Sequence, residues 1–171
     1  MENFKKADIY ALNENPFKIL DKDWMLITAI KDGQVNTMTA SWGGFGILWN
    51  KPVAFIVIRP QRYTYEFVEA AERFSLSFFN ETYRNALKLC GSKSGRDVEK
   101  IKLAKLTILN LPSGASAFSE ARIIMDCRKL YVNDLRKDNF VEQNIPDLVY
   151  KNGDFHRLYI GEIETCWVNN L

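Results

Sequence analysis

The stretch Trp24–Trp42, WMLITAIKDGQVNTMTASW, has the pattern of two strands joined by a tight turn. The segment Trp24–Ile30, apolar except for Thr28, predicts a buried strand. Lys31–Gln34 supplies a hairpin turn, in which Gly33 can adopt a positive φ, and Val35–Trp42 returns as the second strand. No helix fits between strands this close together, which favours antiparallel pairing.

The rest of the chain adds more strands and a few helices. Apolar residues at helical spacing in Tyr65–Arg73 predict a helix with Thr64 as its N-cap. A second helix is expected over Glu81–Leu89, and further strands over Val53–Ile58, Phe74–Phe79, Leu106–Leu109, Ala121–Val132 and Leu158–Val168, the last with a bulge at Gly161. Strands outnumber helices, and the first three follow one another directly. The expected fold is mainly β with flanking helices, an antiparallel barrel and not a doubly wound sheet.

Charge and composition exclude several classes of protein. The chain of 171 residues has 23 Lys and Arg against 21 Asp and Glu, a net charge of +2. Nucleic-acid binders usually carry a larger cationic surplus, so we expect no nucleic-acid partner. The longest apolar run, Val53–Ile58, is far below the roughly 20 residues that span a bilayer, and no signal segment opens the chain. We expect a cytoplasmic protein with no membrane partner, built as one domain over residues 1–171 with residues 1–20 as an N-terminal extension.

The three cysteines predict no metal site. Cys90, Cys127 and Cys166 lie far apart, show no CxxC spacing and have one histidine in the whole chain to assist them. Zinc sites and disulfide frameworks need closer or paired ligands. Thiols buried in a reducing compartment are the expected reading.

One face of the second strand carries a stripe of hydroxyl groups. Because strand side chains alternate, the first face holds Thr37, Thr39 and Ser41, and the second holds Asn36, Met38, Ala40 and Trp42. A flat heteroaromatic ligand such as an isoalloxazine suits a row of polar groups beside an aromatic ring. The alternative is a Thr/Ser strand face selected only for β-propensity.

Two loops carry groups suited to an anion. Arg59–Thr64 places Arg59, Arg62, Tyr63 and Thr64 directly before a helix, where guanidinium groups and unpaired amides favour phosphate. Gly91–Asp97 contains Ser92, Lys93 and Ser94 but lacks the spacing of a P-loop. Ordinary solvated turns are the alternative for both. Gly43–Gly46 lacks the spacing and the following helix of a dinucleotide-binding loop.

His156 is the only histidine and precedes the last expected strand. An imidazole with a pKa near 6.5 can donate a proton or a hydrogen bond around neutral pH. No nucleophilic serine motif or metal-ligand cluster accompanies it. A catalytic role and a structural role both remain open at this point.

In this order, the segments resemble the flavin reductase-like family, and within it the flavoredoxin-like members. The resemblance covers roughly residues 20–168 and rests on Asn36–Gly43, Lys51–Pro52, Arg59–Phe67, Phe74–Phe79, Gly91–Asp97, Gly153–His156 and Ile160–Glu162. It implies an FMN-binding split β-barrel that forms a homodimer, with non-covalent FMN near the subunit interface. NADH or NADPH would be a transient donor, and the acceptor a small molecule or a redox partner protein.

The resemblance also implies a set of site residues. The flavin ring and ribityl chain would contact Asn36, Thr37, Met38, Thr39, Ala40, Ser41 and Trp42. The phosphate would contact Arg59, Arg62, Tyr63 and Thr64, joined by Ser92, Lys93 and Ser94, with His156 beside the ring. Lys93 is the candidate for stabilising negative charge on the reduced ring, and His156 for orienting a group or donating a proton. An NAD(P)H-dependent reductase, an electron carrier with permanently bound FMN and a plain flavin-binding module are the three functions open on this reading.

Overall fold

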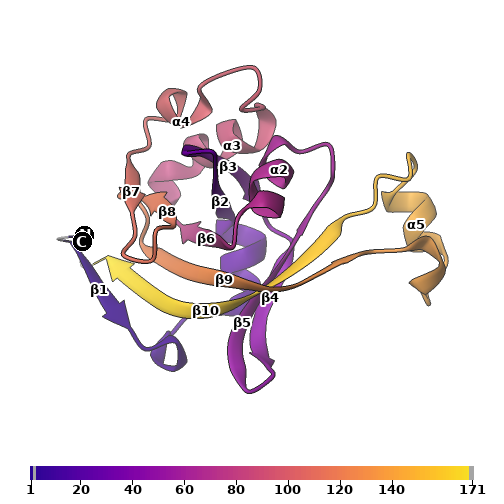
Figure 1. The fold of residues 1–171 in the computed structure, drawn as a ribbon, viewed down its shortest axis with the longest axis horizontal. Helices are drawn as coiled ribbons and strands as arrows, with labels where there is room; N and C mark the ends of the chain where they lie inside the picture. The colour runs from indigo at the N-terminus through magenta and orange to yellow at the C-terminus, as the bar shows by residue number, and fades with distance from the viewer. Residues whose placement is uncertain (2, 170–171) are drawn as a thin grey trace.

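An eight-stranded antiparallel sheet forms the framework of the computed structural model, which describes Met1 and residues 3–169 (Figure 1). Its strands are β1 (Phe4–Ala7), β2 (Met25–Lys31), β3 (Gln34–Ala40), β4 (Gly43–Leu48), β5 (Lys51–Ile58), β6 (Arg73–Phe78), β9 (Ile123–Asp134) and β10 (Arg157–Asn169). The order across the sheet is β3-β2-β6-β9-β10-β5-β4, with β1 also paired to β10. The strands β7 (Ile108–Asn110) and β8 (Ser116–Phe118) make a separate small sheet.

Within the described residues, five short α-helices flank the sheet. They are α1 (Pro16–Lys18), α2 (Tyr63–Ala70), α3 (Arg84–Ser92), α4 (Lys100–Leu103) and α5 (Asn144–Val149). The prediction of a mainly β, antiparallel fold with flanking helices is confirmed. None of the helices in the described part of the chain is long and apolar enough to cross a membrane.

The β2–β3 hairpin forms as predicted, with Met25 opposite Ala40 and Lys31 opposite Gln34. Asp32 and Gly33 both have positive φ, the combination that fits a two-residue hairpin turn to the twist of its strands. The apolar residues of β2 serve two cores, because Met25 and Ile27 pack on one face and Leu26 packs on the other. Burial on both faces explains why Met25–Ile30 is apolar apart from the buried Thr28.

Those two cores lie on opposite sides of the sheet. One joins β2, β5, β6, β9 and β10 to α2 through residues such as Leu76 and Phe67. The other joins the opposite faces of β2 and β9 to α3 and to the β7–β8 sheet, through residues such as Leu87 and Phe118. Helices α2 and α3 are therefore fixed by separate cores, and the segments next to them are held in place relative to the sheet.

Several boundaries differ from the predicted ones. Helix α2 begins at Tyr63 with Arg62 at its N-cap, so the assignment of Thr64 as the cap was wrong. Thr64 lies in the first helical turn, where its buried hydroxyl accepts a hydrogen bond from Asn36 Nδ2. The pattern did not predict β1, β4, β8, α1, α4 or α5. The bulge at Gly161 is confirmed, since the pairing with β9 shifts there and a Cβ would lie 2.7 Å from the ring of Phe74.

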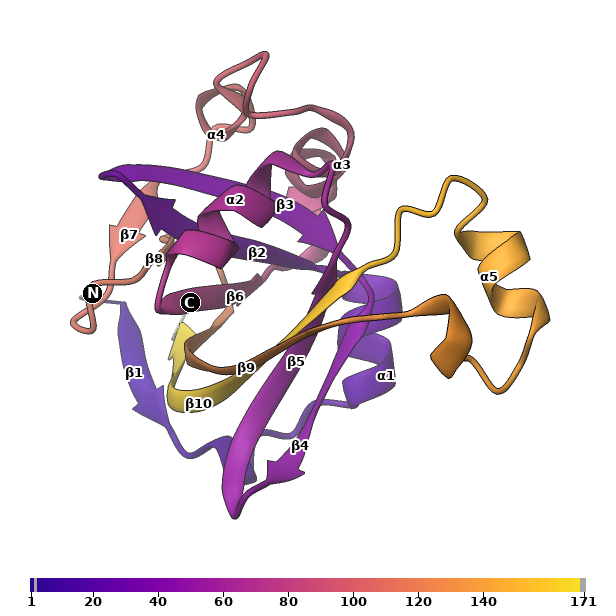
Figure 2. The same cartoon turned by 45° about the vertical axis from the view of Figure 1, so that its right-hand side comes forward.

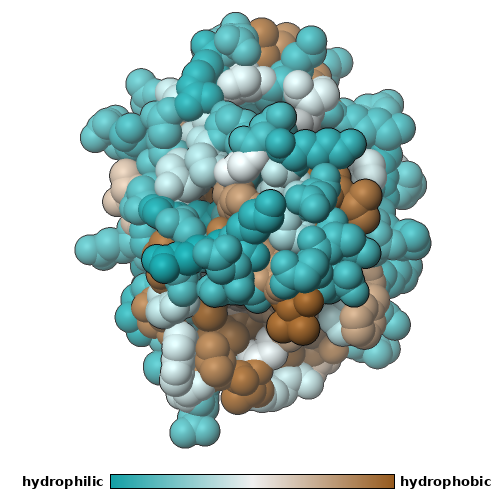
Figure 3. Space-filling model, turned by 90° about the vertical axis from the view of Figure 1, so that its right-hand side faces the viewer, coloured by the Kyte–Doolittle hydropathy of each residue, from teal (hydrophilic) through white to brown (hydrophobic). Residues whose placement is uncertain are grey.

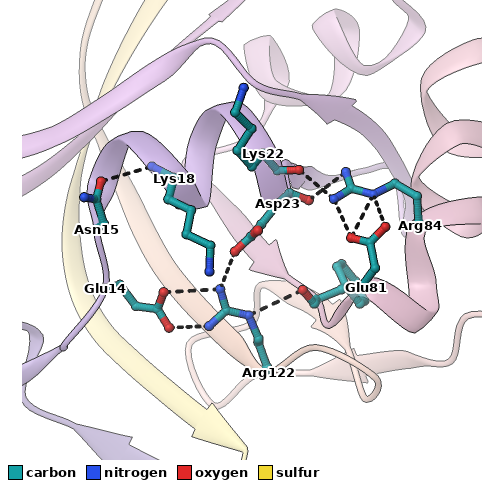
Figure 4. A network of polar contacts seen from close by, with 9 residues as sticks. Glu14, Asn15, Lys18, Lys22, Asp23, Glu81, Arg84 and Arg122 are labelled. Atoms are coloured by element: carbon teal, nitrogen blue, oxygen red, sulfur yellow. Dashed lines mark hydrogen bonds and ion pairs between the residues drawn. The ribbon is translucent and has the colours of Figure 1, made fainter.

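The N-terminal residues are tied to the sheet by ion pairs as well as by β1. Arg122 binds Glu14 and Asp23, and Arg84 binds Glu81 and the backbone carbonyl groups of Lys22 and Asp23 (Figure 4). Charge-assisted contacts of this kind hold the segment that contains α1 against the barrel.

Strands β9 and β10 pair with each other as far as Asp134 and Arg157, where β10 is also paired with β5. The chain between them contains α5 and projects from the barrel (Figures 1 and 2). We call residues 135–156 the arm. Most of the surface seen from the side of the arm is hydrophilic, with hydrophobic side chains gathered in its lower part (Figure 3).

Candidate functional site

A cavity of about 170 Å³ lies between the start of α2 and the loop that follows α3. Its walls are Gln61, Arg62, Tyr63, Thr64, Ser92, Lys93, Ser94 and Lys100. Seven of these residues come from the two loops that the sequence marked as anion-binding, and only Lys100 lies outside them. The structure thus brings the two loops together, and we call this space the anion cavity.

The start of α2 contributes backbone donors to the anion cavity. The first amides of a helix have no partner within it, and the helix dipole adds a positive potential at that end. Arg62, at the N-cap, donates from Nη2 to the carbonyl oxygen of Gly91 at 3.0 Å. This contact ties the first loop to the C-terminal end of α3, and burial lowers the pKa of the Arg62 guanidinium from its ordinary value.

Lys100 is the one buried ammonium group in this cavity. Its residue is 3% exposed, and Nζ donates to the carbonyl oxygen of Lys93 at 3.3 Å. Burial lowers its pKa to about 8, a change that neighbouring Arg62 reinforces and Cys90 opposes. The Cys90 thiol is itself buried, and burial raises its pKa to about 11, so it is neutral at pH 7.

The cations of the anion cavity have no carboxylate partner. Among the described residues, none of Arg62, Lys93 and Lys100 forms an ion pair, whereas the nearby Arg96 and Lys102 pair with Glu66 and Glu99. The result is three positive charges and a helix N-terminus around one small space. Such a set of donors is chemically suited to a phosphate group.

Strand β3 lies against the anion cavity and its inward side chains are already occupied. Thr37 is fully buried and donates to the carbonyl oxygen of Ile27 at 2.9 Å, and Thr39 donates to that of Leu87 at 2.5 Å. The expected stripe of available hydroxyl groups is therefore wrong at these two positions. The pairing of β3 with β2 and its contact with α3 supply internal acceptors, which the sequence pattern does not reveal.

The remaining β3 residues divide between core and surface. Met38 is buried in the core that contains α2, and Ala40 packs against it. Ser41 and Trp42 lie beyond the end of the strand and line a wide hollow of about 800 Å³ with residues of the α1 segment. Trp42 is 52% exposed there, so the end of β3 presents an open aromatic surface.

Asn36 and Gly95 pack tightly against each other and against Thr64 and Tyr63, two wall residues of the anion cavity. Asn36 Nδ2 donates to the Thr64 hydroxyl at 3.0 Å. A Cβ on Gly95 would lie 2.4 Å from Asn36 Oδ1 and 3.1 Å from the ring of Tyr63. Glycine is therefore required for the second loop to approach β3 and α2 this closely.

Arg59 does not reach the anion cavity, contrary to the expectation that both arginines meet at one place. Its Nη1 forms an ion pair with Asp154, and its Nη2 donates to the carbonyl oxygen of Val149 at 3.0 Å. Gln61 Nε2 also donates to Asp154, at 2.7 Å. Arg59 directly follows β5, beside β10, and the arm supplies a carboxylate that neutralises it.

His156 lies at the base of the arm beside Trp42, with ring centroids 5.2 Å apart. It is 8% exposed, and its Nδ1 is 2.9 Å from the Tyr150 hydroxyl oxygen. Burial, reinforced by the charge of Arg59, lowers its pKa to about 4. With this lowered pKa the imidazole is mostly neutral at pH 7, which favours hydrogen bonding over proton donation, the two roles predicted for it.

The sequence reading missed Lys100 and the partners that the arm supplies, Tyr150 and Asp154. Lys100 stands in Glu99–Leu103, a short segment with three charged residues that is typical of a solvated helix. No local signal marks it as buried, because α3 and the second loop cover it. Among the described residues no group of three or more His, Cys, Asp and Glu side chains could hold a metal ion.

Comparison with known proteins places this geometry in a family. Residues 20–171 match the family model described as flavin reductase like domain. A comparison with curated proteins gave no match. Among solved structures, the chain is similar to an FMN-binding domain of a flavin reductases-like enzyme from Shewanella baltica, with a TM-score of 0.72 and 16% identity, covering 98% of this chain and 78% of that one.

Two further solved structures show the same fold. Flavoredoxin from Methanosarcina acetivorans has a TM-score of 0.68 and 19% identity, covering 96% of this chain and 77% of that one. A flavin reductase with a split barrel domain from Shewanella frigidimarina has a TM-score of 0.69 and 18% identity, covering 90% and 71%. The family match over residues 20–171 and the shared split-barrel architecture lead to one conclusion: the chain belongs to the flavin reductase-like family.

Proposed function

We propose that this protein binds FMN without a covalent bond and acts as an NAD(P)H-dependent flavin oxidoreductase. The observation that carries the proposal is the anion cavity, in which Arg62, Lys93 and Lys100 surround a helix N-terminus without a compensating carboxylate. A phosphate monoester fits this donor set by charge and by hydrogen-bonding capacity. Solved structures with the same fold include proteins described as FMN-binding.

The residues of the chain divide into a phosphate end and a ring end. Arg62, Ser92, Lys93 and Ser94 would hold the phosphate together with the first amides of α2. Trp42, Ser41 and neutral His156 would lie near the isoalloxazine, since they surround the open end of β3. This assigns Lys93 to the phosphate end, because it shares a cavity with Arg62 and not with Trp42. FMN, when bound, supplies the hydride and electron chemistry.

The ring end leaves space for a small donor and acceptor. The hollow beside Trp42 is wide, and half of the Trp42 side chain is exposed in it. A nicotinamide could approach a flavin there without a dinucleotide-binding loop of its own. His156 would orient a ligand by a hydrogen bond, since an imidazole with its pKa lowered to about 4 is uncharged at neutral pH and keeps one ring N–H.

The partner proposed for the barrel is a second copy of the chain. Large apolar side chains are exposed along the β4–β5 hairpin, namely Ile47, Leu48, Trp49 and Phe55. Exposed apolar patches of this kind are typical of subunit interfaces. A reducing, cytoplasmic location suits the three buried thiols.

The test is reduction of the purified protein in the absence of oxygen. We expect a yellow protein with an FMN spectrum, whose absorbance bleaches promptly when NADH or NADPH is added. If the absorbance does not bleach within minutes, the protein is not an NAD(P)H-dependent reductase. The alternative function, an electron carrier that exchanges electrons with a partner protein, then takes its place. A colourless preparation that also fails to bind added FMN would remove the cofactor proposal itself.

A further inference from the structure

Lys100 differs from every other lysine in the described part of the chain by being buried, and it faces the anion cavity. Its ammonium group has one hydrogen bond to a backbone carbonyl oxygen and no carboxylate within ion-pair distance. Removing a charge from water is costly unless the charge is paired. An anion that enters the cavity would pair with this ammonium group and so offset the cost of burying it.

We propose that Lys100 makes the anion cavity selective for a phosphate monoester dianion, so that the protein takes a 5′-phosphorylated flavin and discriminates against riboflavin. The inference rests on the proposed function and names the residue that sets its ligand preference. It differs from the general expectation of a basic loop, because Lys100 belongs to neither loop that the sequence marked.

The charge balance around the cavity supports this selectivity. The titratable groups that face Lys100 are Arg62 from the start of α2, Tyr63 beside it, Lys93 from the second loop and Cys90 from α3. None of them carries a negative charge at pH 7, since the Cys90 thiol has a pKa of about 11. A dianion supplies the missing counter-charge, whereas the neutral hydroxyl of riboflavin leaves Lys100 unpaired.

The same arrangement makes phosphate affinity depend on pH. A phosphate monoester is mostly a dianion above a pKa of about 6. Lys100, whose pKa burial lowers to about 8, loses its proton as the pH rises through that value. The affinity for FMN should therefore be highest near pH 7 to 7.5 and fall above about pH 8. Riboflavin affinity should not follow this decline.

The experiment measures the dissociation constants of FMN and riboflavin at pH 7.2 and pH 9.2 for four proteins. They are the natural chain, Lys100→Met, Lys100→Arg and the control Lys102→Met, which changes the exposed lysine of the same helix. Lys100→Met should lose about 10- to 100-fold in FMN affinity, the effect of one charge-assisted contact, with riboflavin affinity nearly unchanged. Lys102→Met should match the natural chain. Lys100→Arg should retain FMN binding and lose the decline at high pH, because guanidinium stays protonated.

Each alternative result has a separate meaning. Equal losses for both flavins in Lys100→Met would show a structural role and overturn the proposal, as would a match between Lys100→Met and Lys102→Met. If Lys100→Met does not fold, the pH dependence of FMN affinity in Lys100→Arg decides. A decline in FMN affinity at pH 9.2 equal to that of the natural chain would contradict the role proposed for Lys100. If the natural chain binds neither flavin, the proposed function fails, and this inference fails with it.

Discussion

The anion cavity and the base of the arm receive their arginines from the same six-residue segment, yet they hold opposite electrostatic environments. In the anion cavity Arg62 contacts a backbone carbonyl oxygen and keeps its charge available. At the base of the arm Arg59 is neutralised by Asp154. The distance along the chain between these arginines is three residues, so position in the sequence does not decide which cation can serve a ligand.

The difference shows that the supply of carboxylates decides where an anion can bind. Arg59 would be a good phosphate ligand by composition, but the arm brings a carboxylate and the Val149 carbonyl oxygen to its guanidinium. The anion cavity contains no acidic side chain among its wall residues. A net charge of +2 is thus compatible with a strongly anion-selective cavity, because most cations of the protein are paired elsewhere.

The largest expected effect comes from exchanging the two arginines for alanine one at a time. Arg62→Ala should weaken FMN binding by about 1.5–3 kcal/mol, since a charge-assisted contact is lost. Arg59→Ala should change FMN binding by less than about 1 kcal/mol, because its ion pair is partly exposed and lies outside the cavity. Fluorescence titration of FMN gives both values. Equal losses of FMN affinity in Arg62→Ala and Arg59→Ala would contradict the proposed difference between the anion cavity and the base of the arm.

The second prediction concerns stability at the base of the arm. His156 has a folded-state pKa of about 4, below its ordinary value of 6.5, so the unfolded chain takes up a proton first as the pH falls. Its contribution to stability is therefore complete above about pH 6.5 and is lost between pH 6.5 and 4. Between pH 7 and pH 5 the loss should be about 2 kcal/mol.

The measurement is urea unfolding of the natural chain and of His156→Gln at both pH values. Glutamine keeps a polar group near Tyr150 but cannot titrate, so the variant should lose the His156 share of the pH dependence. If the free energy of unfolding of His156→Gln changes between the two pH values as much as that of the natural chain, His156 is not the titrating group. The rate of flavin reduction, in contrast, should show no titration of His156 between pH 5.5 and 8.

The smallest expected effect tests the packing of Gly95 behind the wall of the anion cavity. In Gly95→Ala the new methyl group would lie too close to Asn36 and Tyr63, and overpacking of this kind costs about 1 kcal/mol when the nearest atom belongs to a side chain. The affinity for FMN should fall together with the stability of the folded protein. Gly46→Ala is the matched control, because a Cβ there meets nothing within 4 Å. A Gly95 variant as stable and as tight-binding as the control would show that this close packing is not required.

Much of the fold was predictable because its signals are local. The Trp24–Trp42 pattern contains the two strands and the turn of one hairpin, and the structure confirms the strands and the turn. The strand β4 was missed because Gly43–Leu48 contains three glycines, which have low β-propensity and no side chain to reveal a pattern. The arm helix α5 was missed because Asn144–Val149 is short and contains a proline.

The candidate site was predictable only in part. Both anion-binding loops were marked by residue type, and they do meet in one cavity. The occupied hydroxyl groups of Thr37 and Thr39 were not, since their acceptors belong to β2 and to α3. Residue type indicates which chemistry is available, whereas neighbours distant in sequence determine which groups remain free for a ligand.

The sequence by itself determined the antiparallel hairpin, the mainly β architecture and the two loops rich in phosphate donors, because alternation, turn residues and helix starts are properties of a few consecutive residues. Tertiary structure alone decided that Lys100 is buried, that His156 is neutral and that Arg59 is paired. Asp154 lies 95 residues from Arg59 in the sequence. Charge compensation and desolvation depend on distance in space, and only the folded chain brings those groups together.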